Sequence, residues 1–573
     1  MHVGARWFAI AVALTALSKG IAQRAGMAQQ TDMAQQADMA QQADMAPQTD
    51  AARGDAWWAH IQALADDSMR GRLTGTAEYL KAADYVIGQF KADGLQPAGV
   101  NGFYQPVHFD VQRVIAEKSS LALVVNGATT PLQLGPDAIL GARSPQPKTI
   151  AAPLVFLGYG LHLPESQYDD FNSADLPKSE LKGKIVVVIN GGPGTISGPL
   201  KSFARTSPMS KSMEDAGVVG IVSIPTPKSM DFGWERVASG ASQPGMRLAA
   251  DPRDAAVAAK HPALANEHAT RFSASFNPAQ AEKLFAGTGH TFAEMLALAD
   301  AHQPLPHFDL KKSMTATVVT ETTTVESPNL VAKLEGSDPR LKGEYVLVTA
   351  HLDHLGVGAP IHGKTIYSGA MDDASGVATV LETAKLFSQS KVRPRRSMLF
   401  VIFTAEEKGL LGSRYFASHP TVPDKSLVAD LNLDMFMPLF AFKKLHVQGL
   451  EQSTLADDAR KVGAAHGIVI AGDPEPDRNS FIRTDQYSFV QAGVPALAMK
   501  FGWTAGSPEY KQWLGWLAER YHSTADDLNQ PVDKVAAAQF NSFFADLARS
   551  VADDDQRPHY LETSFFRRFE MAR

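Results

Sequence analysis

Three short motifs rich in histidine and acidic residues lie between residues 348 and 435. They are residues 351–354 (His-Leu-Asp-His), residues 369–376, which include two adjacent aspartates, and the pair Glu406-Glu407. The first and third directly follow apolar runs that are typical of β-strands. In an open α/β sheet, ligands bind beyond the carboxyl ends of the strands. We therefore expect these side chains to share one site, and imidazole with carboxylate is a ligand set that suits zinc.

Each motif also has a common structural interpretation. A histidine after a strand is often merely capped or solvated, Asp372 or Asp373 can cap the following helix, and a Glu-Glu pair usually faces solvent. The chemical interpretation is that Asp353 accepts the free ring N–H of His351, since both side chains lie on one side of an extended segment. Adjacent carboxylates are costly to bury without a cation between them. In the Glu-Glu pair, one carboxylate can bind metal while the other stays free as a base.

Two further candidates follow along the chain. Asp434 ends another apolar run, and His522 lies beside Tyr521. Together with the three motifs they supply two histidines and three carboxylates, enough for two zinc ions bridged by one aspartate. The chain has no cysteine, so any metal must be held by His, Asp and Glu.

Alternating strand and helix patterns surround these residues. They predict an α/β domain with a mostly parallel mixed sheet and helices on both faces. The expected strands are 345–350, 397–404, 427–434 and 494–500, and the expected helices are 77–94, 375–388, 409–418, 451–466 and 532–551. Residues 66–73, between two helices, could line a substrate cleft or form a solvated surface loop.

Residues 136–310 have a different character. They contain β-type runs punctuated by Gly, Pro and Asp, and none of these runs ends in metal-ligand residues. We interpret them as a β-rich lid or accessory domain inserted between residues 55–135 and 311–555 of the catalytic domain. The alternative is one large continuous domain. Residues 556–573 form a tail without an assigned role.

The N-terminus predicts export. The apolar run 7–17 is too short to span a bilayer and has the length of a signal-peptide core, so we expect residues 1–22 to be a signal peptide. An uncleaved anchor or a disordered leader is the alternative. Tandem hexads within residues 23–54 indicate a low-complexity linker. We expect a periplasmic or secreted protein without stable membrane insertion once the signal is removed. The net charge of −7 gives no basic stripe for nucleic acid.

The order of the five motifs resembles the co-catalytic zinc exopeptidases, which include bacterial leucyl aminopeptidases and glutamate carboxypeptidase. The resemblance implies that one aspartate bridges two zinc ions, although other divalent metals would also fit. It also implies that the Asp372-Asp373 peptide is often cis, and that residues 168–188 belong to a protease-associated domain. The segment Arg483-Thr484-Asp485-Gln486 departs from the family's usual Ser-Asp-His pattern, so Asp485 is at most a supporting residue. The residues carried over by the resemblance are His351, Asp372, Glu407, Asp434 and His522 as metal ligands, Glu406 as general base, Asp353 as the residue that orients His351, and Tyr521 as a residue that stabilises the oxyanion or simply packs in the core.

We therefore predict a secreted zinc-dependent aminopeptidase that acts on peptide substrates. A carboxypeptidase, a dipeptidase or a glutaminyl cyclase on the same fold is the first alternative, and Arg483 could serve a carboxypeptidase by binding the substrate carboxylate. A catalytically inactive binding protein on this scaffold, as in the transferrin receptor, is the second. The sequence leaves the oligomeric state and the preferred substrate residue open.

Overall fold

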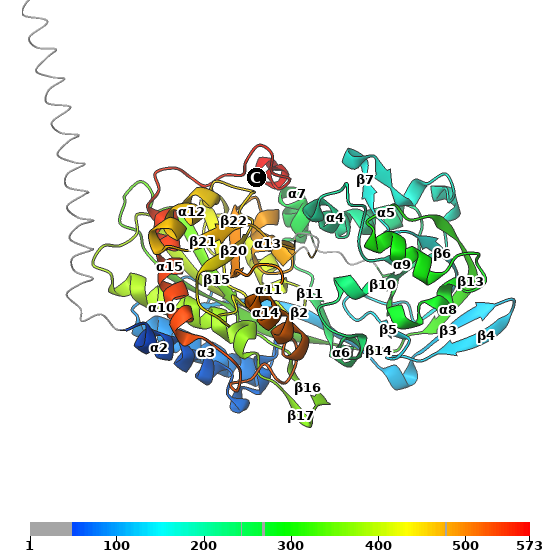
Figure 1. Cartoon of the computed structure of the whole chain (residues 1–573), viewed down its shortest axis with the longest axis horizontal. Coiled ribbons are helices and arrows are strands. Elements are labelled where there is room, and N and C mark those ends of the chain that lie inside the picture. Colours follow the sequence, from blue (N-terminus) through cyan, green and yellow to red (C-terminus); the bar gives the residue numbers. More distant parts are fainter. Residues whose placement is uncertain (1–48, 242, 266–269, 476–477, 479, 573) are drawn as a thin grey trace, which may run out of the picture.

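The computed structural model describes residues 49–241, 243–265, 270–475, 478 and 480–572 (Figure 1). The expected signal peptide and residues 23–48 of the expected linker lie outside these residues. The expected end of the linker at residue 54 is wrong, because helix α2 (Asp50–Leu64) begins earlier, with the Thr49 hydroxyl accepting a hydrogen bond from the Ala52 amide. Among the described residues, no helix combines the length and apolarity needed to cross a membrane.

The main domain is built on a mixed sheet. Its centre is parallel, in the order β18, β15, β19 and β22, and antiparallel strands extend it on both sides. In sheet order the strands are β11 (Gly245–Leu248), β2 (Tyr104–Val114), β14 (Thr320–Leu334), β18 (Ser397–Phe403), β15 (Tyr345–His351), β19 (Leu427–Asn432), β22 (Ala496–Phe501), β20 (Lys444–Gln448) and β21 (Val469–Ala471), and β1 (Gln96–Pro97) pairs with β14. The predicted α/β fold class is confirmed.

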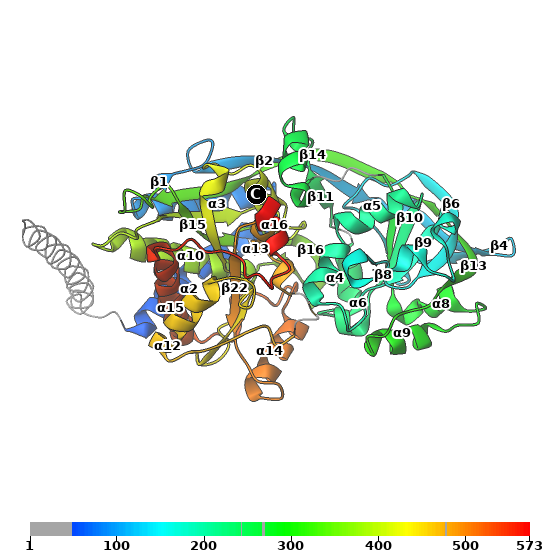
Figure 2. The ribbon, with the colours of Figure 1, turned by 90° about the horizontal axis from the view of Figure 1, so that it is seen from above.

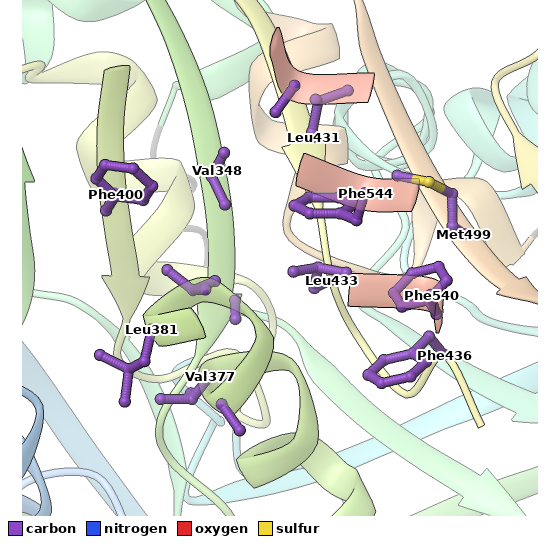
Figure 3. Close-up of a cluster of buried hydrophobic side chains, with 14 of the residues drawn as sticks. Val348, Val377, Leu381, Phe400, Leu431, Leu433, Phe436, Met499, Phe540 and Phe544 are labelled. Carbon is purple, nitrogen blue, oxygen red and sulfur yellow. The ribbon is translucent and has the colours of Figure 1, made fainter. Parts of the chain in front are cut away.

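Helices cover both faces of this sheet because its central strands are apolar on both sides. Val346 and Val348 of β15 pack into one hydrophobic cluster and Leu347 into another on the opposite face. Figure 3 shows part of the first cluster, in which Phe540 approaches Phe436. The first face is covered by α2, α3 (Ala77–Ala92), α10 (Ser375–Gln389), α12 (Leu455–His466) and α15 (Lys534–Asp553), and the second by α11 (Leu411–Ser418) and α13 (Gln486–Gln491).

A second sheet forms a separate domain, and the long strands β2 and β14 lie between the two parts (Figure 2). In sheet order its strands are β4 (Ala128–Leu132), β3 (Ser120–Val125), β13 (His307–Thr317), β6 (Thr149–Leu157), β9 (Ile185–Ile189), β10 (Gly220–Ile224), β12 (Phe272–Phe276) and β5 (Ala138–Leu140). Its helices are α4 (Gly198–Ala204), α5 (Ser207–Asp215), α6 (Trp234–Gly240), α8 (Glu282–Phe285) and α9 (Phe292–Asp300). Helix α7 (Asp254–Lys260) follows β11 and packs on the second face of the main sheet through Val257.

The limits of this second domain differ from the expected 136–310. Its sheet includes β3 and β4 before that range and extends through β13 to Thr317, so we define the second domain as residues 120–317. Strand β11 lies within this range of the sequence, but it belongs to the main sheet, where it pairs with β2. The insertion is thus tied to the main domain by strand pairing. Its interpretation as a protease-associated domain stays a prediction.

Candidate active site

The predicted ligand residues meet at one edge of the main sheet. His351 is the last residue of β15, Asp434 follows β19 by two residues, and Glu406-Glu407 follows β18. These strands are parallel, so their carboxyl ends lie side by side. Asp372 lies in the turn Ala370–Ala374 that precedes α10, and His522 follows α14 (Pro508–Glu519).

Asp372 occupies the centre of this cluster. Its Oδ1 lies 3.3 Å from Nε2 of His351, and its Oδ2 lies 3.2 Å from Nε2 of His522. The Asp372-Asp373 peptide is cis, as the family resemblance implied. One carboxylate therefore faces two imidazoles with its two oxygens, which is the arrangement expected of a bridging ligand.

The remaining predicted residues divide between the two sides of Asp372. Asp434 Oδ1 lies 3.9 Å from Nε2 of His351, so these two residues and Asp372 form one group of potential ligands. On the other side, Glu407 Oε2 lies 3.2 Å from Nε2 of His522. Glu406 Oε2 is 4.0 Å from Nε2 of His351, beside the first group.

His354 was not predicted to take part, yet it joins the second group. Its ring is fully buried, and its Nδ1 lies 2.7 Å from Glu407 Oε1 and 3.9 Å from Asp372 Oδ2. The only signal in the sequence is the second histidine of the His-Leu-Asp-His motif, three residues after His351.

The cluster fits a metal ion because several of its polar atoms are buried without a hydrogen-bond partner among the described residues. Buried polar groups are nearly always hydrogen-bonded in folded proteins, so a group of orphaned atoms requires an explanation. Nitrogen and carboxylate oxygen are the donors that zinc accepts. The orphaned atoms are His351 Nε2, both ring nitrogens of His354, Asp372 Oδ2 and Glu407 Oε1.

A cavity of about 540 Å³ gives access to this cluster. Asp372, Glu406 and Asp434 contribute to its walls, together with Asp231 from the second domain. Asp231 forms ion pairs with Arg478 and Arg483 of the main domain. The cluster is therefore reached through a cleft that both domains line.

Comparison with known proteins agrees with this geometry. Residues 329–548 match the family described as Peptidase family M28. Leupeptin-inactivating enzyme 1 of Streptomyces exfoliatus is 28% identical over 211 residues, covering 35% of this chain and 43% of that protein. Carboxypeptidase Q of Rattus norvegicus is 32% identical over 178 residues, covering 30% of this chain and 33% of that protein. The chain thus matches less than half the length of either relative.

Residues 329–548 thus resemble peptidase family M28. The fold agrees over a longer span: an aminopeptidase from Aneurinibacillus sp. strain AM-1 superposes with a TM-score of 0.50 at 18% identity, covering 86% of this chain and 92% of that structure. The expected resemblance to zinc exopeptidases is confirmed. The match places the buried cluster inside the M28 region.

The carboxylates of this M28 site have opposite pKa shifts. Burial raises the pKa of Glu406 well above its ordinary value, and the nearby negative charges of Asp434 and Glu407 add to this effect. Burial acts in the same direction on Glu407 and Asp372, but the imidazoles beside them hold the pKa of both well below the ordinary value. Glu406 therefore holds a proton more readily than Glu407 or Asp372.

The acids beside His522 and His351 raise the pKa of both imidazoles. Burial lowers the pKa of His522, but Glu407 and Asp372 raise it more strongly, to about 10. Burial also lowers the pKa of His351, but Glu406 and Asp372 raise it more strongly, so the pKa lies well above its ordinary value. A bound cation would replace the protons in balancing this negative charge.

The predicted role of the Asp353 side chain is wrong in one respect. Nδ1 of His351 lies 2.9 Å from the backbone carbonyl oxygen of Asp353, whereas the carboxylate is 3.9 Å away. The carboxylate instead accepts hydrogen bonds from the Glu406 and Glu407 amides and from the Thr74 hydroxyl. The reason is that β15 ends at His351, so the alternation of an extended segment stops there. Asp353 fixes the backbone of the glutamate pair.

Arg72, in the 66–73 segment, holds together the loops that carry the ligand cluster. Its side chain is fully buried, and its guanidinium donates hydrogen bonds to four backbone carbonyls. Burial lowers its pKa to about 10, although nearby aspartates oppose this. Residues 66–73 were expected to form a solvated loop or to line a substrate cleft, and at Arg72 they do neither, because this side chain is buried away from the cavity. The four carbonyls belong to Leu64, Leu352, Ser368 and Gly369, so Arg72 joins the loop after His351 to the loop before Asp372.

Two neighbours complete the support of the bridging aspartate. The Asp526 carboxylate accepts hydrogen bonds from the Met371 and Asp372 amides, at 2.9 and 3.0 Å. Gly369 has a φ of 61°, and a Cβ there would lie 2.2 Å from the Asp372 carbonyl oxygen and 2.5 Å from the His354 ring. Any side chain at residue 369 would therefore displace both loops.

Tyr521 lies against His522, with ring centroids 4.1 Å apart. Burial raises the pKa of its hydroxyl well above the ordinary value, so the hydroxyl remains a hydrogen-bond donor. Phe232 of the second domain packs on both rings.

Asp485 is buried behind the site, where burial raises its pKa to about 7. Arg483 is paired with Asp231, which the sequence did not predict.

Proposed function

We propose that this chain is a zinc-dependent metallo-exopeptidase and, more specifically, an aminopeptidase that releases N-terminal residues from peptides. The observation that carries the proposal is the position of Asp372, whose two oxygens face His351 and His522, with Glu406 beside but outside these pairs. The M28 match of residues 329–548 supports the same reaction class.

In this proposal, Asp372 would contribute to both of two zinc sites, with His351 and Asp434 completing one and Glu407 and His522 the other. When bound, zinc would polarise the peptide carbonyl and lower the pKa of a water molecule. The side chain of Glu406 accepts the proton of the attacking water at Oε2 and returns it to the leaving nitrogen.

The surrounding residues orient these groups. The Asp353 carboxylate, through the Glu406 and Glu407 amides, fixes the backbone that carries the base. The Tyr521 hydroxyl, which stays protonated, donates to the oxygen on which negative charge develops. Phe232 covers Tyr521 and His522 and reduces the access of water to this side of the cleft.

A carboxypeptidase is the second candidate, and Arg483 in the cleft is the observation that favours it. The ion pair of Arg483 with Asp231 weighs against this alternative, because the guanidinium already has an acidic partner. The Aneurinibacillus aminopeptidase supports the first candidate only through similarity of fold.

The test is a comparison of aminoacyl anilides with N-blocked dipeptides, each with and without a chelator. The proposal expects hydrolysis of the anilides only, loss of activity with the chelator, and recovery on adding zinc. Cleavage of the N-blocked dipeptides instead would identify a carboxypeptidase. Activity that is indifferent to the chelator would refute the mechanism, and zinc binding without hydrolysis of either substrate would indicate a binding protein.

We also propose that the protein is exported, on the basis of the apolar run at residues 7–17. Sequencing the N-terminus of the protein from cell fractions tests this. Export predicts a mature chain that begins near residue 23 outside the cytoplasm, and a full-length cytoplasmic chain would contradict it.

A further inference from the structure

A second cavity, of about 410 Å³, lies beside the active-site cleft between the two domains. It shares Arg143, Thr206, Gly409 and Arg414 with that cleft. Its lining comes from α5 and β10 and from β11 and α11. Figure 1 shows where these four elements lie. Its lining includes no Asp or Glu among the described residues, but it includes six cationic side chains, namely Arg143, Arg205, Arg247, Arg271, Lys408 and Arg414. We refer to it as the basic pocket.

Three of these cations have partners within the protein and build the walls. The Arg205 guanidinium donates to the backbone carbonyls of Ile189 and Gly191. Arg247 pairs with Asp110 at 2.6 Å, behind the pocket. Arg414 donates to backbone carbonyls of the segment that follows α7.

The other three cations form no ion pair with an acid among the described residues, although Glu407 and Asp353 act on Lys408 from a longer distance. Lys408 is only 5% exposed, yet among the described residues it has neither an ion pair nor a hydrogen bond. Arg143 likewise has none, and Arg271 makes a single hydrogen bond, of 3.3 Å, to the Ser210 hydroxyl. Burying a lysine without a partner is costly, because the charge loses its water. Three cations without such an ion pair around one cavity therefore indicate an anionic ligand.

The position of the basic pocket relates it to the substrate. Lys408 and Gly409 directly follow Glu407, and two residues of extended chain span at most about 7 Å. Because Gly409 lines both cavities, the basic pocket adjoins the loop that carries Glu407. A planar carboxylate matches the paired N–H groups of arginine, and such charge-assisted bonds are stronger than neutral ones.

We propose that the basic pocket binds a carboxylate of the peptide substrate on the C-terminal side of the bond that is cleaved. This rests on the proposed function and specifies its substrate class. The carboxylate can come from the C-terminus of a short peptide or from an Asp or Glu side chain one or two residues beyond the bond. In either case, Arg143 faces the carboxylate at the point where the two cavities meet, because it lines both.

The test measures kcat/KM on three tripeptides with the same free N-terminal residue. One ends in a free carboxylate, one in an amide, and one in an amide with glutamate as its third residue. Wild type is expected to prefer the free acid over the plain amide by about 10- to 100-fold, given the strength of charge-assisted hydrogen bonds. A similar preference for the glutamate-containing amide over the plain amide would show that a side-chain carboxylate can also bind in the basic pocket. Both preferences are expected to fall to about one in Arg143→Gln and Arg271→Gln.

Arg340→Gln is the matched control, because this side chain is 76% exposed and lines neither cavity. It should retain the wild-type preferences. Equal cleavage of acid and amides by wild type would overturn the inference and leave the proposed function intact.

If none of the tripeptides is cleaved, the proposed function fails and the pocket is tested by calorimetry with succinate as the probe. Binding by wild type that is weakened about 10-fold in Arg143→Gln and Arg271→Gln supports the anion site. Absence of binding, or binding that both variants retain, overturns it.

Discussion

Nδ1 of His354 lies 2.7 Å from Oε1 of Glu407, and neither atom has a hydrogen-bond partner with proper geometry among the described residues. A buried imidazole and a carboxylate in such close contact either form an ion pair or share a cation. His354 therefore either binds the metal itself or fixes Glu407 for that purpose.

Replacing His354 by glutamine should lower the affinity for zinc by about 10- to 100-fold, the usual cost of removing a residue that supports a metal ligand. Competition with a chelator measures this affinity directly. His446→Gln is the control, because His446 lines the same cleft but contacts Trp503 rather than the ligand cluster. Equal zinc affinity in wild type and His354→Gln would show that His354 has only a packing role.

The two adjacent glutamates should have separable roles. Glu406→Gln is expected to reduce kcat by about 100- to 10,000-fold while leaving the zinc content unchanged, because it removes only the base. Glu407→Gln is expected to lose zinc as well as activity. Metal analysis and kinetics on the same samples check both statements. A Glu406→Gln variant with wild-type kcat would refute the assigned base.

Arg72→Met should destabilise the folded protein by about 3 kcal/mol or more, because four buried carbonyls lose a charged donor. Thermal or denaturant unfolding measures the change. Arg70→Met is a matched control, since Arg70 also has a left-handed backbone but its side chain is 55% exposed. The control should change stability by less than about 0.5 kcal/mol. Similar effects of the two substitutions would contradict the supporting role of Arg72.

The contact between the domains should depend on pH through Asp231. Burial raises the pKa of Asp231, but Arg483 and Arg478 outweigh this and hold it below the ordinary 3.8. Because the folded pKa is the lower one, the ion pairs contribute stability above about pH 4, and this contribution disappears as the pH falls through the folded pKa.

Asp231→Asn should therefore lower Tm by a few degrees at neutral pH, and its difference from wild type should shrink in acid below about pH 4. Melting curves across this pH range test the prediction. Asp215→Asn, at an exposed helix residue paired with Lys211, should leave Tm nearly unchanged. A Tm difference for Asp231→Asn that grows as the pH falls would have the wrong sign for this ion pair.

The sequence alone could locate these ligands because each lies next to a recognisable element. His351 ends an apolar strand, Asp434 follows another by two residues, and Asp372 precedes an amphipathic helix. Parallel strands bring their carboxyl ends together, so a one-dimensional pattern was sufficient to predict a three-dimensional cluster.

The supporting contacts could not be predicted in this way. Arg72 binds carbonyls of loops that are far from it along the chain, and no local periodicity reports such a contact. The role of Asp353 depended on where β15 ends, and strand ends are the least predictable feature of a sequence pattern. Asp231 and Phe232 reach the cleft from the second domain, so their role depends on how the two domains pack.

The most direct test of the account is the zinc content of wild type and of Asp372→Ala after dialysis. The account predicts two zinc ions per chain in wild type and a marked loss from both sites in the variant, because one carboxylate serves both ions. A wild-type protein that binds no zinc, or an Asp372→Ala variant with unchanged zinc content, would contradict a dinuclear site bridged by Asp372.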